Sequence, residues 1–588
     1  MDTISLPVTE PPWVTFKDGD LHINRVAGPV PGFLLEANQA VKAGDLQRAK
    51  DLLCPANIQG LESVVGAGPV RIDLMYMATT LLLTLGRHEQ AEAWCRRIIQ
   101  DQPDPAAYHH LARCFCDHLG RQTEALGYAQ KAFEAESDNP WFCETYGRLL
   151  VSAGRQEEGI EVLKKAVAAD PDDALWLSEL LWYMHYVASY HRQDFYEGYR
   201  EWGRLATAGI QARERFPNDP NPDRTLRIGL LSPDLHRSSA ATTLEPFLDG
   251  YSRRALEVYG YGDLTGADEV TERMASKFYR LRDVRGMDSR RIATLVEQDG
   301  IDILVELAGH VQGNYLEVLA YRPAPVQADY GHIDTTGLEV IGYRITDALL
   351  DPPETQRYYV EQLTYLPGGM ACFRPPKTSP LVSPLPARIN GFVTFGTFNV
   401  NIKISDEILT LWARILLETP GSRLVMKFMA GHDPQIRARY LDQFARMGVD
   451  PARITIHGQV SAWGHLELFS QVDLALDTYP YNGGMTTQEG MWMGVPTVTL
   501  AGDTFVSRMG LNVLSRVGLE AFVSASAEEY VAKACALAGQ MEVLEQIRFG
   551  LRPRMLDSSL CNPGRIAGEM EQALRRMWRS WCDRQVVS

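Results

Sequence analysis

The chain has 588 residues, which is too long for a single hydrophobic core and predicts a multi-domain globular protein. Its 45% hydrophobic and 22% charged residues are ordinary for a soluble protein, and no apolar run approaches the roughly 20 residues of a membrane-spanning helix. The formal net charge of -16 argues against a general nucleic-acid surface. The first residues do not resemble a secretory signal, and the nine scattered cysteines include no C-x-x-C pair, so we expect a cytoplasmic protein with reduced thiols.

A repeat of 34 residues is visible in the first third of the chain. The tripeptide Leu-Gly-Arg or Ala-Gly-Arg occurs at this spacing at 85–87, 119–121 and 153–155. Small residues hold the same register at Ala91, Ala125 and Gly159. The period is typical of tetratricopeptide (TPR) helix hairpins, which stack into a superhelix, and we assign such repeats to residues 30–190. The concave surface of the superhelix is expected to bind an extended partner chain, and a helical spacer without a ligand is the alternative.

The pattern changes after the repeats. Residues 191–223 predict a helical adaptor that ends in a linker rich in Pro, Asn and Asp. Beyond the linker, β-rich apolar runs alternate with helical stretches, which predicts parallel sheets covered by helices on both faces. A proline-rich break at 375–386 separates two such blocks, at 224–385 and 386–560, and a C-terminal helix at 561–588 follows. The predicted fold is an α-helical solenoid followed by two doubly wound α/β lobes with a ligand cleft between them.

The segment DTYPYNGGMTTQEGMWMGVPTVTL, residues 477–500, has the features of a nucleotide-phosphate site. It follows a β-rich run at 472–476, and its small residues allow a sharp turn before a helix that two threonines can cap. The positive end of such a helix favours a diphosphate, and an acidic residue one turn further on can bind ribose hydroxyls. An ordinary β-α-β crossover whose glycines only serve packing is the alternative. The candidate donor-binding residues here are Asn482, Gly483, Gly484, Thr486, Thr487 and Glu489.

Three segments resemble the O-linked N-acetylglucosamine transferase family, which includes SPINDLY-type and bacterial relatives. The segment at 477–500 resembles the donor site of the family, RIGLLSPD at 227–234 its first strand and turn, and DGIDILVELAGH at 299–310 its central strands. With the repeats, the resemblance covers most of the chain. It implies a GT-B fold of two Rossmann-like lobes and a protein O-glycosyltransferase that inverts configuration. It also implies a nucleotide-sugar co-substrate and no resident cofactor.

The resemblance assigns roles to three residues of the C-terminal lobe. Lys403 matches the phosphate-binding lysine of the family, and a cation there can neutralise charge on a departing nucleoside diphosphate. Asn399 matches a donor contact, although Val400 stands where vertebrate relatives carry a polar residue. His465 matches the histidine that stacks on uracil. The alternatives are a solvated lysine and a histidine that only caps or packs.

The N-terminal lobe departs from the family pattern. Ser238 and Thr242 stand where relatives carry two histidines that line the sugar pocket, and the loop at 327–337 is one residue shorter than in relatives. These differences leave the identity of the transferred sugar undetermined. Asp234 and His310 both end predicted strands at the cleft, and either can be the general base or a structural residue. The sequence contains no residue cluster at metal-ligand spacing, so a metal-independent reaction is expected.

These expectations combine into a protein O-glycosyltransferase. A nucleotide sugar, by default UDP-N-acetylglucosamine, binds the C-terminal lobe, and a Ser or Thr hydroxyl of an acceptor that the repeats recruit attacks it. Flagellin is a candidate acceptor, and a flagellin glycosyltransferase with a CMP-nonulosonic acid donor is an alternative. A catalytically inactive TPR scaffold is another alternative. A sugar-phosphate epimerase would also use two doubly wound lobes, but it gives no reason for the repeats.

Overall fold

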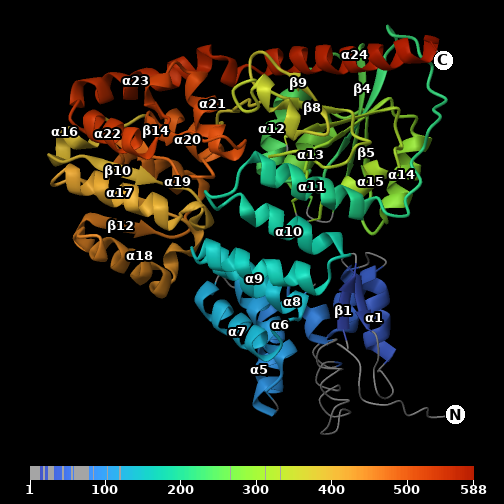
Figure 1. Ribbon diagram of the computed structural model, residues 1–588, viewed down its shortest axis with the longest axis horizontal. Coiled ribbons are helices and arrows are strands. Elements are labelled where there is room, and N and C mark those ends of the chain that lie inside the picture. Colours follow the sequence, from blue (N-terminus) through green and yellow to red (C-terminus); the bar gives the residue numbers. More distant parts are fainter. Residues whose placement is uncertain are drawn as a thin grey trace. The chain divides into compact units, whose positions relative to one another are not determined.

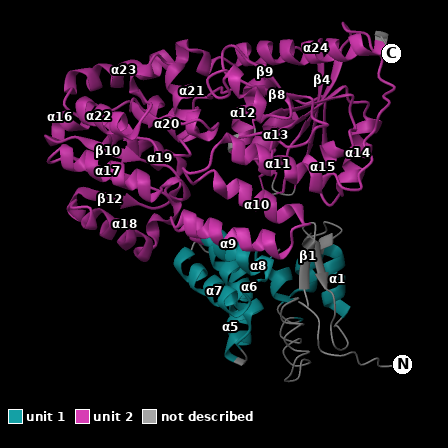
Figure 2. Cartoon of the chain, viewed as in Figure 1, with its two compact units in different colours: residues 1–149 teal, residues 150–588 magenta. Residues whose placement is uncertain are grey.

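The computed structural model describes residues 14–17, 20–23, 32–42, 46–54, 57, 78–83, 85–101, 103–117 and 121–587, apart from 265–266, 312 and 332. The chain forms two compact units, 1–149 and 150–588, which have different colours in Figure 2. The boundary lies within one helix, α8 (Pro140–Ser152). The predicted repeat region, 30–190, therefore extends over both units.

The helices of the repeat region follow the predicted period. α5 (His88–Asp101) and α7 (Gln122–Ala135) begin 34 residues apart, and α9 (Gln156–Ala169), in the larger unit, continues the spacing. Gly86 and Gly154, in the turns before α5 and α9, have φ of 74° and 79°, a region that glycine adopts without strain. Gly120, the third glycine of the predicted motif, lies outside the described residues. Other elements that the structure describes in the smaller unit are β1 (Val14–Lys17), β2 (Asp20–Ile23), α1 (Gly32–Lys42), α2 (Leu46–Leu52) and α6 (Pro105–Asp117).

The N-terminal lobe of the larger unit is built on a parallel sheet of seven strands in the order β5-β4-β3-β6-β7-β8-β9. Its strands are β3 (Leu226–Leu231), β4 (Leu256–Gly262), β5 (Arg280–Asp283), β6 (Ile303–Glu306), β7 (Val326–Tyr330), β8 (Tyr343–Thr346) and β9 (Gln362–Tyr365). Its helices are α12 (Ser239–Gly250), α13 (Glu269–Ala275), α14 (Ser289–Gln298) and α15 (Leu316–Ala320). Successive residues of β6 face opposite cores, since Ile303 packs with α12 and α13 whereas Leu304 packs with α14 and α15. The predicted helix-covered parallel sheet is confirmed.

The C-terminal lobe has a second parallel sheet, with six strands in the order β12-β11-β10-β13-β14-β15. Its strands are β10 (Thr394–Thr397), β11 (Arg423–Lys427), β12 (Ile454–His457), β13 (Leu474–Leu476), β14 (Thr497–Leu500) and β15 (Val523–Ser524). Its helices are α16 (Pro386–Asn390), α17 (Asp406–Glu418), α18 (Pro434–Arg446), α19 (Ala462–Leu468), α20 (Met485–Trp492), α21 (Met509–Ser515), α22 (Ala527–Ala538) and α23 (Met541–Asp557). The strand order reverses between β10 and β13, where Phe395 pairs with Leu474. In doubly wound sheets ligands bind beyond the carboxyl ends of the strands at this switch point.

Two further segments cover the N-terminal lobe. α10 (Ala174–Met184), from the predicted repeat region, and α11 (Arg192–Ala206), from the predicted adaptor, pack into the same core as α14 and α15. The last helix, α24 (Pro563–Val587), follows the C-terminal lobe in sequence but packs on α12, and Figure 1 shows it in red along the green N-terminal lobe. The chain therefore crosses twice between the lobes, once after β9 and once before α24.

Candidate donor site and its surroundings

The loops that follow β10 and β13 meet at the switch point of the C-terminal lobe. Lys403 ends a short 3-10 turn (Asn401–Lys403) after β10, and its Nζ donates a hydrogen bond of 2.8 Å to the backbone carbonyl of Asn482. The same Nζ lies 3.7 Å from the ring centroid of Tyr481, within the range of a cation-π contact. The sequence-predicted Lys403 and Asn482 are thus in direct contact.

Burial lowers the pKa of Lys403 to about 7, and the nearby carboxylate of Asp477 opposes this shift. In the free protein near neutral pH, a large fraction of the Lys403 side chains is therefore in the uncharged amine form. A dianionic ligand beside Nζ would favour the protonated form and raise the pKa again. The site is suited to a cation that becomes fully charged when an anion binds.

Asp477 organises the Gly-rich loop, a role that the sequence did not reveal. Its side chain is buried and accepts hydrogen bonds of 2.7 Å from the amide of Gly483 and from Thr499 Oγ1. Burial raises the pKa of Asp477 to about 6, while these hydrogen bonds and Lys403 act in the opposite direction. A carboxylate directly after a strand at the switch point is the signal that could have identified it.

The turn at Gly483 allows no side chain. A Cβ atom there would lie 2.5 Å from Thr487 Oγ1 and 3.1 Å from both Asn399 Oδ1 and Asp477 Oδ1. The structure therefore brings the predicted residues Asn399, Gly483 and Thr487 together around one backbone position. The small-residue signal in the sequence has a steric cause here.

The helix after this turn begins as predicted but is not capped as predicted. The N-cap of α20 is Gly484, no side chain caps the helix, and the hydroxyl of Thr487 instead donates to the carbonyl of Gly483 at 3.1 Å. The first hydrogen bond of the helix runs from the amide of Gln488 to Gly484. The amides of the first turn, including that of the partly exposed Thr486, thus have no partner within the helix. The expected capping by Thr486 or Thr487 is wrong, because Gly484 occupies the cap.

His465 and Glu489, the two residues expected at the nucleoside, form a pair. His465 on α19 donates from Nε2 to Glu489 Oε2 on α20 at 3.0 Å, and its ring lies against Phe398 and Phe469 with centroids 5.8 and 5.5 Å away. Lys427, at the carboxyl end of β11, is a neighbouring cation that the sequence reading missed. Burial lowers the pKa of Lys427, and Glu489 opposes the shift. A polar and aromatic cluster therefore lies at the same sheet edge as the Gly-rich loop.

Asp234 lies beyond the carboxyl end of β3 in the N-terminal lobe. It is partly exposed, and its carboxylate Oδ1 is 3.7 Å from His236 Nε2. Its backbone carbonyl accepts from Ser238 Oγ at 3.0 Å, and Ser238 in turn caps α12 by accepting from the amide of Ala241. Thr242 donates to the carbonyl of Ser238 at 2.9 Å. Ser238 and Thr242 thus hold the start of α12.

The expectation that His310 reaches the cleft is wrong. The side chain is 3% exposed, its Nε2 lies 3.0 Å from the carbonyl oxygen of Thr336, and its Nδ1 lies 3.2 Å from Ser178 Oγ on α10. The rings of Tyr199 and Trp202 on α11 lie 4.3 Å from the imidazole, centroid to centroid. Burial lowers the pKa of His310 to about 3, so the ring is neutral and donates from Nε2. His310 therefore connects the loop after β6 to α10 and α11.

No group of three or more His, Cys, Asp or Glu side chains within the described part of the chain is arranged to hold a metal ion. None of the helices in that part is both long and apolar enough to cross a membrane.

Comparison with protein families gives two matches. Residues 210–372 and 385–570, more than half of the chain, match the model described as Glycosyl transferase family 41. Residues 119–178 match a Tetratricopeptide repeat model. The second match includes α9, which belongs to the larger unit.

Individual relatives agree with these matches. The chain is 36% identical over 430 residues to a rice (Oryza sativa subsp. japonica) protein and 37% identical over 425 residues to an Arabidopsis thaliana protein, both named probable UDP-N-acetylglucosamine–peptide N-acetylglucosaminyltransferase SPINDLY. These alignments cover 72% and 71% of this chain but 46% of each relative, so the chain spans about half the length of the curated relatives it matches. A solved variant of the Thermobaculum terrenum O-GlcNAc transferase has a TM-score of 0.80 and 30% identity, and the superposition covers 95% of this chain and 98% of that one.

Proposed function

Because this chain belongs to glycosyltransferase family 41, we propose that it transfers N-acetylglucosamine from UDP-N-acetylglucosamine to Ser or Thr hydroxyls of a protein acceptor. The observation that carries the proposal is the contact of Lys403 with the Gly-rich loop at the switch point of the C-terminal lobe. A cation and a helix N-terminus in one place favour a diphosphate. The names of the rice and Thermobaculum relatives supply the default sugar.

In the proposed reaction the diphosphate lies between Lys403 and the first turn of α20. The acceptor oxygen attacks the anomeric carbon, the bond from that carbon to the diphosphate oxygen breaks, and UDP leaves with the bonding electrons. Lys403 and the amides of α20 stabilise the negative charge that develops on the leaving group. Asp234 takes the proton of the acceptor hydroxyl, since His310 is buried with both ring nitrogens engaged. Attack opposite to the leaving group inverts the configuration.

The nucleoside half of the donor is assigned to the cluster around His465. Its imidazole face can stack on a base, and Glu489, which already accepts from His465, can accept from ribose hydroxyls with its other oxygen. Asn399 lies beside Gly483 and Thr487, where an amide can reach a phosphate oxygen. These roles leave the repeats free to bind the acceptor.

A second donor class is supported by one observation. Ser238, the N-cap of α12, and Thr242, in the first turn of this helix, donate to nearby backbone carbonyls at the positions where the resemblance implies two histidines facing the sugar. A CMP-linked nonulosonic acid is therefore the alternative donor. Flagellin stays a prediction, since neither the contacts nor the relatives bear on the acceptor, and it is the first protein to try.

A nucleotide panel tests the proposal. UDP, CMP and GDP are added separately to the wild-type chain and to Lys403→Ala, and the thermal unfolding midpoint is recorded. A ligand at about 100 times its Kd stabilises the folded state by about 2.7 kcal/mol, so binding gives a clear upward shift. We expect UDP to stabilise the wild type and to stabilise the variant much less. A preference for CMP would favour the alternative donor, and no response to any nucleotide would favour the inactive scaffold.

UDP affinity should fall as the pH rises through the pKa of Lys403. The protonated side chain binds the diphosphate. Because burial holds its pKa at about 7 in the free protein, the protonated form predominates below pH 7 and declines above it. The Kd of UDP is therefore expected to increase about tenfold between pH 7 and pH 8.5, as measured by calorimetry. Lys403→Arg, whose guanidinium stays charged, is the control and should show a nearly flat profile. Parallel profiles in the two proteins would contradict the assignment.

A further inference from the structure

The first residue of the repeat helix α9 reaches into the C-terminal lobe. Gln156 is 6% exposed, and its Nε2 donates to the backbone carbonyls of Ile402 and Ile404 at 3.2 and 3.1 Å. These two carbonyls flank Lys403 in the chain. One side chain therefore fixes the backbone on both sides of the lysine.

The turn before α9 makes two more contacts with the same lobe. The side-chain amide of Asn401, two residues before Lys403, donates to the carbonyl of Ser152. Arg439 on α18 donates from Nη2 to the carbonyl of Gly154 at 2.6 Å. Gln156 and Asn401 thus connect the start of α9 and the residues before it to the turn that contains Lys403, and Arg439 adds a contact from α18.

A second contact comes from the chain just after α10. Tyr186 is 6% exposed, and its ring stacks on that of Tyr481 with centroids 5.2 Å apart and planes 21° from parallel. Tyr481 is the residue whose ring lies under the Lys403 ammonium. Tyr186 therefore supports the surface on which the lysine rests.

We propose that α9 and the end of α10 are part of the donor site, with Gln156 and Tyr186 as positioning residues that set where Lys403 Nζ lies. The inference rests on the proposed role of Lys403 at the diphosphate. A lysine has a long flexible side chain, and fixing its backbone and its ring support lowers the entropy lost when it binds an anion. A repeat helix thereby contributes to nucleotide binding as well as to the solenoid.

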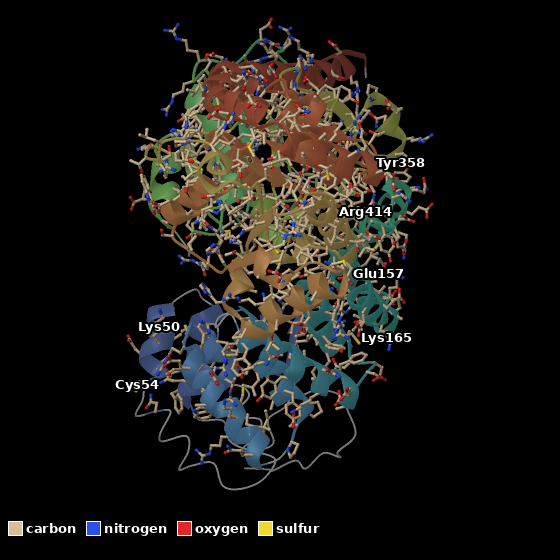
Figure 3. The ribbon with its side chains drawn as sticks, turned by 90° about the vertical axis from the view of Figure 1, so that its left-hand side faces the viewer. Lys50, Cys54, Glu157, Lys165, Tyr358 and Arg414 are labelled. Carbon is tan, nitrogen blue, oxygen red and sulfur yellow. The ribbon has the colours of Figure 1, made fainter. Side chains whose placement is uncertain are left out.

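A double-mutant cycle on UDP affinity tests the proposal with the full chain. Gln156→Leu removes the two donated hydrogen bonds at similar side-chain volume, and we expect the Kd of UDP to rise about tenfold. In the Lys403→Ala background the same change should have little effect, because the residue it positions is gone. Lys165, exposed further along α9 (Figure 3), gives the matched control Lys165→Ala, which should bind UDP like the wild type.

The pH dependence of UDP affinity distinguishes a positioning role from a merely structural role, because a merely structural role would leave it unchanged. In Gln156→Leu a less confined Lys403 is better solvated, so its pKa rises and the loss of UDP affinity shifts to higher pH. Tyr186→Leu gives a second, independent variant with the same expectation, and Tyr186→Phe, which keeps the ring, should restore wild-type binding. An unchanged Kd and pH midpoint in both Gln156→Leu and Tyr186→Leu would overturn the inference.

The outcomes separate this inference from the proposed function. If Lys403→Ala alone leaves UDP affinity unchanged, the proposed donor site itself fails. If Lys403→Ala weakens binding but Gln156→Leu and Tyr186→Leu do not, only the positioning role fails. If Gln156→Leu weakens UDP binding equally in the wild-type and Lys403→Ala backgrounds, its effect does not act through the lysine and the inference is wrong.

Discussion

Lys403→Ala is expected to lower kcat for glycosyl transfer by about 10²- to 10³-fold, the usual loss when one preorganised group that stabilises developing charge is removed. The ammonium contacts the carbonyl of Asn482, beside the turn that leads into α20, so its loss leaves the departing diphosphate with the helix amides alone. The effect should be greater on kcat than on the KM of the acceptor, which binds elsewhere. Both parameters are measured from the steady-state transfer of radiolabelled N-acetylglucosamine from UDP-N-acetylglucosamine to an acceptor protein.

Two controls define the result for Lys403. Circular dichroism and thermal unfolding should show that Lys403→Ala keeps the fold, since the lysine lies at the rim of the core. Lys403→Arg keeps the charge but presents a planar fork in place of a compact ammonium, so we expect it to recover part of the lost rate. A rate for Lys403→Ala within about threefold of the wild type would remove the lysine from the mechanism.

Asp234→Asn is expected to lower kcat by about 10²- to 10⁴-fold while leaving the Kd of UDP nearly unchanged. The substitution keeps the size of the side chain but removes the base that accepts the hydroxyl proton. Asp234 is partly exposed beyond β3, so it is accessible to an acceptor. Single-turnover transfer, combined with calorimetric UDP binding, separates the chemical step from donor affinity.

His310→Asn is the matched test of the other candidate base. The buried imidazole has partners at both nitrogens, so the change should lower the free energy of unfolding by about 1–3 kcal/mol. The folded fraction should keep a single-turnover rate near that of the wild type. A large rate loss in His310→Asn together with a small one in Asp234→Asn would reverse the two assignments.

The parts of the fold that the sequence predicted well depend on local pattern. The 34-residue period places α5, α7 and α9, and the predicted β-rich run at 472–476 contains β13. Both signals lie within a short window, so no distant contact is needed to read them. The Gly-rich turn was also predictable, because a side chain at Gly483 would collide with Thr487 and Asn399.

The error on His310 and the omission of Gln156 arise from contacts between distant parts of the chain. His310, which follows β6, is buried in part by Ser178 on α10 and by Tyr199 on α11, residues more than 100 positions earlier in the chain. Gln156 contacts residues about 250 positions later, and nothing in its repeat register distinguishes it from Gln122. The capping error was local, since Gly484 competes with the threonines for the same position.

The placement of α24 has a consequence for synthesis of the protein. Its apolar side chains, including Ile566, Leu574 and Trp578, complete the core that α12 and β3 also form, yet they are translated only after the whole C-terminal lobe. Domains generally fold as units in the order in which they leave the ribosome. Here the C-terminal lobe is contiguous and emerges whole, whereas the N-terminal lobe must wait for α24, which follows the C-terminal lobe in sequence. A nascent chain with both sheets already synthesised therefore still exposes an apolar surface of the N-terminal lobe until α24 has emerged.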